Sequence, residues 1–385
     1  MTTTNNNEHK KLNVPNLRFP EFQGEWEEST IGEMFDLYSG NTPSRLNKKH
    51  FKGTVNWISS GELKEHYIYS SKEQISEEAA KSLKLLPVGT FVIAIYGLEA
   101  DGVRGTGSIT QEPSTISQAC MSFIPKGVIE NEFLYSWYKK HGNVIGIRYA
   151  QGTKQQNLSY DILEGFKIAY PCTKEQKKLN KFITFLDERI ATQNKIIDKL
   201  QTLIKGIAQH CTKRLTSGNK HARLGDICKI TTGKLDANAQ VENGLYPFFT
   251  CAEKPFRIDS FAFDTEALLI SGNGANLGYI NYYKGKFNAY QRTYVLDQFS
   301  ENIQYVKWVL KVLLPKRIAI EKSSSNTPYI ILSTLADLRL PIAYNSEQSN
   351  IANLMQSLGR KLSSQIALKD SYNNLKQYLL RQMFI

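Results

Sequence analysis

The segment "KEQKKLNKFITFLDERI" (174–190) is echoed by "SEQSNIANLMQSLGRKL" (346–362), with the same opening Glu-Gln and a similar spacing of apolar residues. From Glu175 to Glu347 the offset is 172 positions. Internal repeats indicate the architecture of a chain, because similar sequence segments fold into similar structural units. The echo therefore predicts a chain made of two similar halves.

The repeat extends upstream of this segment. "IGEMFDLYSG" (31–40) matches "LGDICKITTG" (224–233) at an offset of 193, so the second copy is shorter by 21 residues in its middle. In both copies short segments rich in Val, Ile, Tyr and Phe follow, separated by Gly, Asn and Ser, as is typical of strands. The predicted strands include 54–59, 119–125, 267–272 and 293–299, and short amphipathic helices are predicted at 131–140 and 303–313.

Each copy ends in a long periodic segment in which apolar residues recur at alternating steps of three and four, a pattern that predicts coiled-coil helices. The expected seams are Leu179, Ile183, Leu186, Ile190, Gln193, Ile197, Leu200, Ile204, Ile207 and Cys211, and Ile351, Met355, Leu358, Leu362, Gln365, Leu368, Tyr372, Leu375 and Leu379. Gln193 and Gln365 hold equivalent places, where a lone polar residue fixes register. The alternative is that both glutamines face solvent.

The predicted fold class is α+β. We expect two similar globular domains, each a mixed sheet plus short helices, separated by two long antiparallel coiled-coil helices in an internal pseudo-two-fold repeat. A helix of about 40 residues spans about 60 Å, and its apolar stripe needs a partner helix. The expected boundaries are a disordered tail at 1–16, a first domain at 17–172, a helix at 173–216, a second domain at 217–344 and a helix at 345–385.

The net charge of +12 favours a polyanionic partner, either nucleic acid or an acidic membrane surface. The alternative is a basic protein whose charge is incidental. "MTTTNNNEHK" (1–10) lacks the apolar core of a signal peptide, and the apolar run "FVIAIYG" (91–97) is too short to span a bilayer. We therefore expect a cytoplasmic protein. The basic residues of the first long helix are interpreted as a solvated face, with contact to phosphate or an acidic subunit as the alternative.

The sequence offers little support for chemistry within the chain. The five cysteines form no CxxC pair, and the six histidines are scattered, which argues against a disulfide framework and a metal site. No Pro-Pro and no GxxxxGK[ST] motif occurs. "SGNGANLG" (271–278) is interpreted as a polar tight turn rather than a nucleotide loop, with "RGTGS" (104–108) as its counterpart. "ELKEH" (62–66) is interpreted as a solvated turn.

Four features in their duplicated order carry a resemblance to a known family. They are the two "xGD/E…G" starts, "WISSGEL" (57–63), "GTKQQNLS" (152–159) and the two Glu-Gln helix starts. From about Leu17 onward the chain resembles the specificity subunit of type I restriction–modification systems. The second copy departs from the pattern, because "SSSNTPYIILSTL" (323–335) aligns with "GTKQQNLSYDIL" (152–163) only after a local shift.

The resemblance implies a DNA-binding protein. The two domains would be target-recognition domains, each reading one part of a bipartite asymmetric target in double-stranded DNA, and the helices would set the spacer. Two modification subunits and the restriction subunits would be partners, and S-adenosylmethionine, ATP and Mg would belong to them, leaving this chain without a catalytic residue, cofactor or metal. The alternatives are a coiled-coil protein-interaction scaffold without DNA specificity and a self-contained nuclease or methyltransferase.

Base reading requires Arg, Lys, Asn or Gln side chains with reach to base edges, and phosphate contacts require basic or small polar groups. Polar loop residues of both domains meet this requirement. The predicted DNA-binding residues are Arg45, Lys48, Lys49, Arg104, Thr106, Lys154, Gln155, Gln156, Lys234, Lys254, Arg257, Asn273, Asn276, Arg292 and Asn326.

Overall fold

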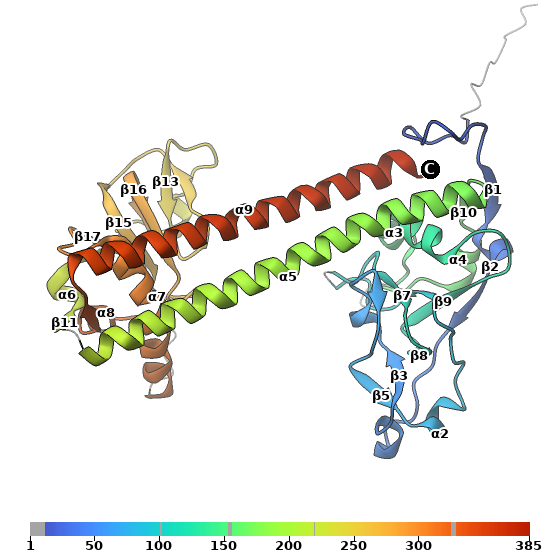
Figure 1. The fold of residues 1–385 in the computed structure, drawn as a ribbon, viewed down its shortest axis with the longest axis horizontal. Helices are drawn as coiled ribbons and strands as arrows, with labels where there is room; N and C mark the ends of the chain where they lie inside the picture. Colours follow the sequence, from blue (N-terminus) through green and yellow to red (C-terminus); the bar gives the residue numbers. More distant parts are fainter. Residues whose placement is uncertain (1–11, 101, 153–155, 219, 325–328) are drawn as a thin grey trace, which may run out of the picture. The chain divides into compact units, whose positions relative to one another are not determined.

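The computed structural model describes residues 12–100, 102–152, 156–218, 220–324 and 329–385. The chain divides into two compact units, Met1–Gln193 with Leu368–Ile385, and Asn194–Ala367 (Figure 1). Both long helices contribute to both units, so each unit contains a segment of each. Of the predicted tail, residues 1–11 lie outside the described residues, while the carbonyl of Asn13 accepts a hydrogen bond from the Trp26 N–H at 2.7 Å.

The first unit contains mixed sheets. Their strand orders are β1-β10, β2-β9-β6-β7-β4 and β5-β3-β8, with parallel pairing in β4·β7 and β3·β8. The strands are β1 (Glu27–Thr30), β2 (Phe35–Ser39), β3 (Val55–Ile58), β4 (Tyr67–Ile68), β5 (Glu73–Ile75), β6 (Phe91–Ala94), β7 (Gly107–Thr110), β8 (Ser114–Ile116), β9 (Cys120–Pro125) and β10 (Lys167–Tyr170). The helices are α1 (Ile31–Met34), η1 (Lys48–Phe51), η2 (Ser60–Glu62), α2 (Glu77–Ala80), α3 (Asn131–Tyr149) and α4 (Tyr160–Glu164).

The second unit has the strand orders β11-β18 and β12-β17-β15-β16-β13-β14, with β13 and β16 parallel. Its strands are β11 (Lys220–Arg223), β12 (Lys229–Thr232), β13 (Tyr246–Phe249), β14 (Phe256–Ile258), β15 (Phe263–Ser271), β16 (Ile280–Ala289), β17 (Thr293–Asp297) and β18 (Arg339–Ile342). Its short helices are α6 (Leu224–Ile227), η3 (Ala237–Ala239), α7 (Ile303–Ser324) and α8 (Leu332–Ala336). The predicted helix at 303–313 is therefore too short, because α7 continues past Pro315.

The two units repeat the same topology. The order β2-β9-β6-β7 recurs as β12-β17-β15-β16, and the pair β1·β10 recurs as β11·β18. The short helices α1, α3 and α4 recur as α6, α7 and α8 at the same places in the order of elements. The predicted α+β class and the internal repeat are thus confirmed in the fold.

Two glycines show how closely the copies agree. A Cβ at Gly40 would lie 2.0 Å from the carbonyl oxygen of Ile116, and a Cβ at Gly233 would lie 1.9 Å from that of Ala289. Gly40 directly follows β2 and Gly233 directly follows β12, and the carbonyls opposite them belong to the last residues of β8 and β16. These positions exclude a side chain because backbone lies directly opposite, which is why the repeated motif ends in Gly.

The long helices start with the same buried amide. In α5 (Thr173–Gly218), Gln176 Oε1 accepts from the Glu130 N–H at 3.0 Å and its Nε2 donates to the Pro171 carbonyl at 2.9 Å. In α9 (Asn345–Met383), Gln348 Oε1 accepts from the Asn302 N–H at 3.0 Å and its Nε2 donates to the Ala343 carbonyl at 2.9 Å. The repeated glutamine joins the start of the long helix to the start of α3 or α7.

The long helices pack against each other within each unit. In the first unit the start of α5 shares a core with the end of α9, where Leu179 and Ile183 belong to the same cluster as Leu379. In the second unit the end of α5 meets the start of α9 through Ile204, Ala208 and Met355. The helices therefore run antiparallel, as the sequence predicts.

The ten predicted seam positions of α5 are all buried or half-buried. Gln193 is 5% exposed and Gln365 is half-buried, so the alternative that both glutamines face solvent is wrong. In α9 the predicted seam fails at Leu368 and Leu375, which are 39% and 43% exposed. The physical reason is that this end of α9 packs against the first domain with another face, on which Lys376 and Leu380 are buried. The basic residues of α5 are exposed, which agrees both with a solvated face and with a face that contacts phosphate or an acidic subunit.

The prediction of a solvated turn at 62–66 is wrong for His66, which is 8% exposed. Its ring stacks on Tyr135 at 3.9 Å between centroids. Its Nε2 lies 2.8 Å from Glu132 Oε2 and its Nδ1 lies 3.0 Å from Asp187 Oδ2. Asp187 of α5 also pairs with Lys376 of α9. This charge network joins the first domain to both long helices.

The His66 network makes stability depend on pH. Burial by itself lowers the pKa of His66, but the contacts with Asp187 and Glu132 outweigh it, and the net pKa is raised above 6.5. The free energy of unfolding that protonated His66 contributes is fully present below pH 6.5, the ordinary histidine pKa. It is lost as the pH rises through the higher pKa that His66 has in the folded protein. We expect the urea concentration at the unfolding midpoint to decrease for the wild type when the pH is raised from about 6 to about 8. The decrease should be larger than that of the His66→Gln variant over the same pH range. Parallel profiles for the two proteins would contradict this assignment.

The close approach at Gly233 gives a second prediction. Gly233→Ala forces a Cβ against backbone and should lower the free energy of unfolding by about 2–3 kcal/mol. Gly206→Ala is the matched control, because nothing lies within 4 Å of its Cβ position in α5. The control should stabilise the helix by up to about 1 kcal/mol. Denaturant unfolding of both variants checks this, and a neutral Gly233→Ala would refute the steric argument.

Candidate nucleic-acid interface

Two predicted residues of the first domain, Arg104 and Gln156, are in contact, and Thr106 lies close to Arg104 along the chain. Arg104 Nη2 donates to Gln156 Oε1 at 3.1 Å, and the Gln156 N–H donates to Glu99 Oε2 at 2.8 Å. This last bond lowers the pKa of Glu99. The Thr106 hydroxyl donates to the Val103 carbonyl at 2.7 Å. The loops 97–106 and 151–157 therefore present Arg104 and Gln156 as a preorganised pair. The predicted residues Lys154 and Gln155 lie outside the described residues.

Arg45, Lys48 and Lys49 occupy a separate part of the same domain, around η1 and the sheet β5-β3-β8. Arg45 Nη2 lies 2.8 Å from Glu73 Oε2, and its guanidinium carbon lies 4.5 Å from the ring centre of Phe51. Arg45 thus stabilises this small sheet, although its side chain is still 57% exposed. Lys48 and Lys49 are exposed at the start of η1.

In the second domain four segments meet. The Gly272 N–H donates to the Arg292 carbonyl at 2.8 Å, and Asn276 Nδ2 donates to the Cys251 carbonyl at 3.0 Å. The Gln291 N–H donates to the Leu235 carbonyl at 2.9 Å. We name the segments 233–235, 250–254, 272–278 and 290–292 the second loop cluster. It contains the predicted residues Lys234, Lys254, Asn273, Asn276 and Arg292.

The remaining predicted residues of the second domain lie elsewhere. Arg257 on β14 donates from Nε to the Gly244 carbonyl and from Nη2 to the Leu245 carbonyl, both at 2.9 Å. These bonds hold the 241–245 loop, so the Arg257 guanidinium has a role in the fold. Asn326 lies outside the described residues.

The sequence reasoning missed the acidic side chains Glu99 and Glu73 that hold the candidate polar groups. Gln156 is 57 positions from Glu99, and Arg45 is 28 from Glu73, so no local spacing pairs them. Among the described residues, no group of three or more His, Cys, Asp or Glu lies where it could hold a metal ion. All five cysteines are free thiols. None of the described helices combines the length and apolarity that a membrane crossing requires.

The comparisons with known proteins agree with one another. A family model described as "Type I restriction modification DNA specificity domain" matches residues 23–202 and again residues 216–369. The chain is 42% identical over 145 residues to the EcoDI type I restriction enzyme specificity subunit of Escherichia coli, a match that covers 38% of this chain and 32% of that one. It is 24% identical over 402 residues to the MjaIX specificity subunit of Methanocaldococcus jannaschii, covering 92% and 90% of the two chains.

The fold has a solved counterpart. The crystal structure of the type I restriction-modification system S subunit from M. genitalium aligns with a TM-score of 0.68 over 97% of this chain and 99% of that chain. The two sequences are 18% identical, so this likeness is one of fold. The duplicated domain is therefore supported by sequence models and by three-dimensional structure.

The second loop cluster generates a testable prediction. Lys234→Gln and Arg292→Gln should weaken binding to a non-specific duplex and reduce the slope of log K against log salt by about 0.9 for each phosphate that is no longer neutralised. Lys195→Gln, an exposed site on α5, is the charge-matched control. Arg257→Gln should lower stability and leave the salt slope unchanged. Fluorescence anisotropy over a salt series measures these slopes, and equal slopes for all four variants would contradict the assignment of this cluster to DNA.

Proposed function

The chain belongs to the type I restriction–modification DNA specificity family, and from this premise we propose that it reads a bipartite, asymmetric target in double-stranded DNA. The observation that carries the proposal is the duplication: the family model matches twice, and each copy has its own polar loops. Because Arg104 and Gln156 of one copy differ from Asn276 and Arg292 of the other, the two half-targets should differ as well.

The specificity family is non-catalytic, and its members work within a complex on DNA. We propose that this chain positions two modification subunits and the restriction subunits on the target, in the cytoplasm. S-adenosylmethionine, ATP and Mg would then bind to those partners, and the assembled complex would act as an adenine methyltransferase and an ATP-dependent endonuclease. The scaffold alternative is not favoured, because the family match covers both copies.

We also propose that α5 and α9 set the spacer between the half-targets. Each helix follows a domain directly, and in each unit the two helices pack along an apolar seam. Side chains on such a seam repeat every seven residues, so an insertion of seven residues in both helices preserves the packing. A spacer set by the helices should change with such an insertion, whereas the half-targets should stay the same.

The function is tested by co-expressing the chain with the modification subunit of its system and mapping methylated adenines across host DNA. The expected result is a motif of two unlike halves with a fixed gap. The double variant Arg104→Ala, Gln156→Ala should lose base specificity in one half of the target, and Asn276→Ala, Arg292→Ala should lose it in the other half. The expected loss is about 1–3 kcal/mol of discrimination for each bidentate hydrogen-bonded pair that the substitutions remove. Methylation without a gapped motif, or the failure to form a complex, would overturn the proposal.

A further inference from the structure

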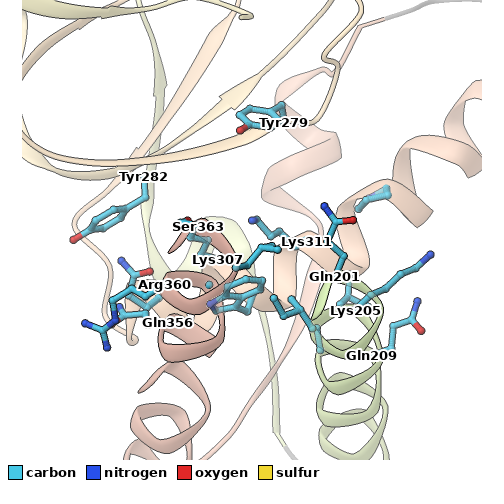
Figure 2. A pocket seen from close by; sticks show the side chains of 18 of the residues that line it. Gln201, Lys205, Gln209, Tyr279, Tyr282, Lys307, Lys311, Gln356, Arg360 and Ser363 are labelled. Atoms are coloured by element: carbon cyan, nitrogen blue, oxygen red, sulfur yellow. The ribbon is translucent and has the colours of Figure 1, made fainter. Parts of the chain in front are cut away.

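The second unit contains a pocket of about 1120 Å³ between α5, α7, α9 and the strand β16. Its lining is cationic, and among the described residues that line it there is no Asp or Glu. The five cationic side chains are Lys205, Lys307, Lys311, Lys316 and Arg360. Figure 2 shows Lys307 and Lys311 of α7 between the two long helices, with Tyr279 and Tyr282 on the side of the sheet.

The same place in the first unit is filled and neutralised. Gln176 and Gln348 make equivalent bonds, so an offset of 172 relates α3 to α7 and the α5 start to the α9 start. By this offset Tyr135 of α3 corresponds to Lys307 of α7. Tyr135 is covered by the His66 ring, which pairs with Glu132 and Asp187.

The acidic groups of the first unit have no acidic counterpart in the second. The offset places Gly359 where α5 has Asp187, and Gln304 where α3 has Glu132. The His66 segment is also missing: 59–72 lies between β3 and β5, but only 250–255 lies between the corresponding strands β13 and β14. The second copy therefore has Lys307 where the first has Tyr135, and it lacks the carboxylates and the histidine ring that occupy this site in the first copy.

The pocket disfavours the charged form of Lys307. Burial, with a smaller contribution from the neighbouring charge of Lys311, lowers the pKa of Lys307 to about 8. No described carboxylate lies within ion-pair distance of Lys307 or Lys311. Trp308 lies beside them, and its Nε1–H is buried without an acceptor among the described residues. Lys307 and Trp308 are half-buried, and a partly desolvated cation and an unpaired donor both gain from an anionic acceptor.

We propose that this pocket receives an Asp or Glu side chain carried on an apolar segment of a partner protein. In the first copy the carboxylates of Glu132 and Asp187 occupy the equivalent site. We therefore expect a carboxylate to occupy this pocket as well. The apolar lining from Ile204, Val312 and Leu362 favours a protein segment over a DNA phosphate, because phosphate contacts rely on polar and basic groups. The identification of that partner as the modification subunit rests on the proposed function above.

The test supplies the missing carboxylate from the chain itself. Gly359→Asp places it at the position equivalent to Asp187, and a Cβ there meets only the Trp308 ring, at 4.0 Å. Gly359→Asn is the uncharged control of the same size. In the isolated full chain, Gly359→Asp should melt at a higher temperature than Gly359→Asn, and high salt or an added Lys307→Met should remove the difference. Equal melting temperatures would overturn the carboxylate assignment without involving any partner.

Binding of the modification subunit to the full chain provides the second readout. Gly359→Asp should weaken it by about tenfold or more relative to Gly359→Asn, because the partner's carboxylate meets an occupied and neutralised site. A zero-length amine–carboxyl cross-linker should join Lys307 or Lys311 of the wild type to an Asp or Glu of the modification subunit, identified by mass spectrometry. These cross-links should be absent in Gly359→Asp.

The outcomes separate this inference from the proposed function. If the wild type binds the modification subunit and methylates a gapped motif, but Gly359→Asp and Gly359→Asn bind it equally, the pocket inference fails and the function stands. If Gly359→Asp weakens DNA binding and leaves subunit binding unchanged, the occupant is a phosphate and the inference is overturned. If the wild type binds no modification subunit, the proposed function and this partner fail together.

Discussion

The buried side-chain amides of Gln176 and Gln348 are the joint on which each half of the molecule depends. Glutamine both accepts and donates, so one side chain satisfies the N–H at the start of the shorter helix and a carbonyl just before the long helix. Both glutamines are at most 1% exposed, so loss of either would leave buried backbone groups unpaired. This joint ties the start of each long helix to the start of the shorter helix in its domain.

The two copies share this joint and diverge around it. In the first copy a longer segment between β3 and β5 brings His66 onto Tyr135, and Asp187 and Lys376 complete a charge network. In the second copy a shorter connection and Gly359 leave a cationic pocket at the equivalent place. Duplication has thus produced one site that holds the chain together and one that is open to a partner.

The candidate DNA-facing residues also divide by role once their contacts are known. Arg45 and Arg257 hold small sheets and loops through Glu73 and through backbone carbonyls. Arg104 is oriented by Gln156, and this orientation lowers the entropy that it loses when it meets a base. A list of basic loop residues cannot make this distinction, because an arginine that binds a carbonyl and one that faces solvent have the same local sequence.

The sequence by itself determined the duplication, the α+β class and the course of α5, because repeated motifs and seven-residue periodicity are local properties of a chain. It also showed that Gly40 and Gly233 recur, but the reason, a backbone carbonyl directly opposite each of them, came from the structure. The tertiary structure alone decided that Leu375 is exposed, which depends on the surface that the end of α9 meets, and that His66 is buried, which depends on its contacts with α3 and α5. The pairing of His66 with Asp187 spans 121 positions. Contacts at that separation are set by packing in three dimensions, and no spacing in the sequence encodes them.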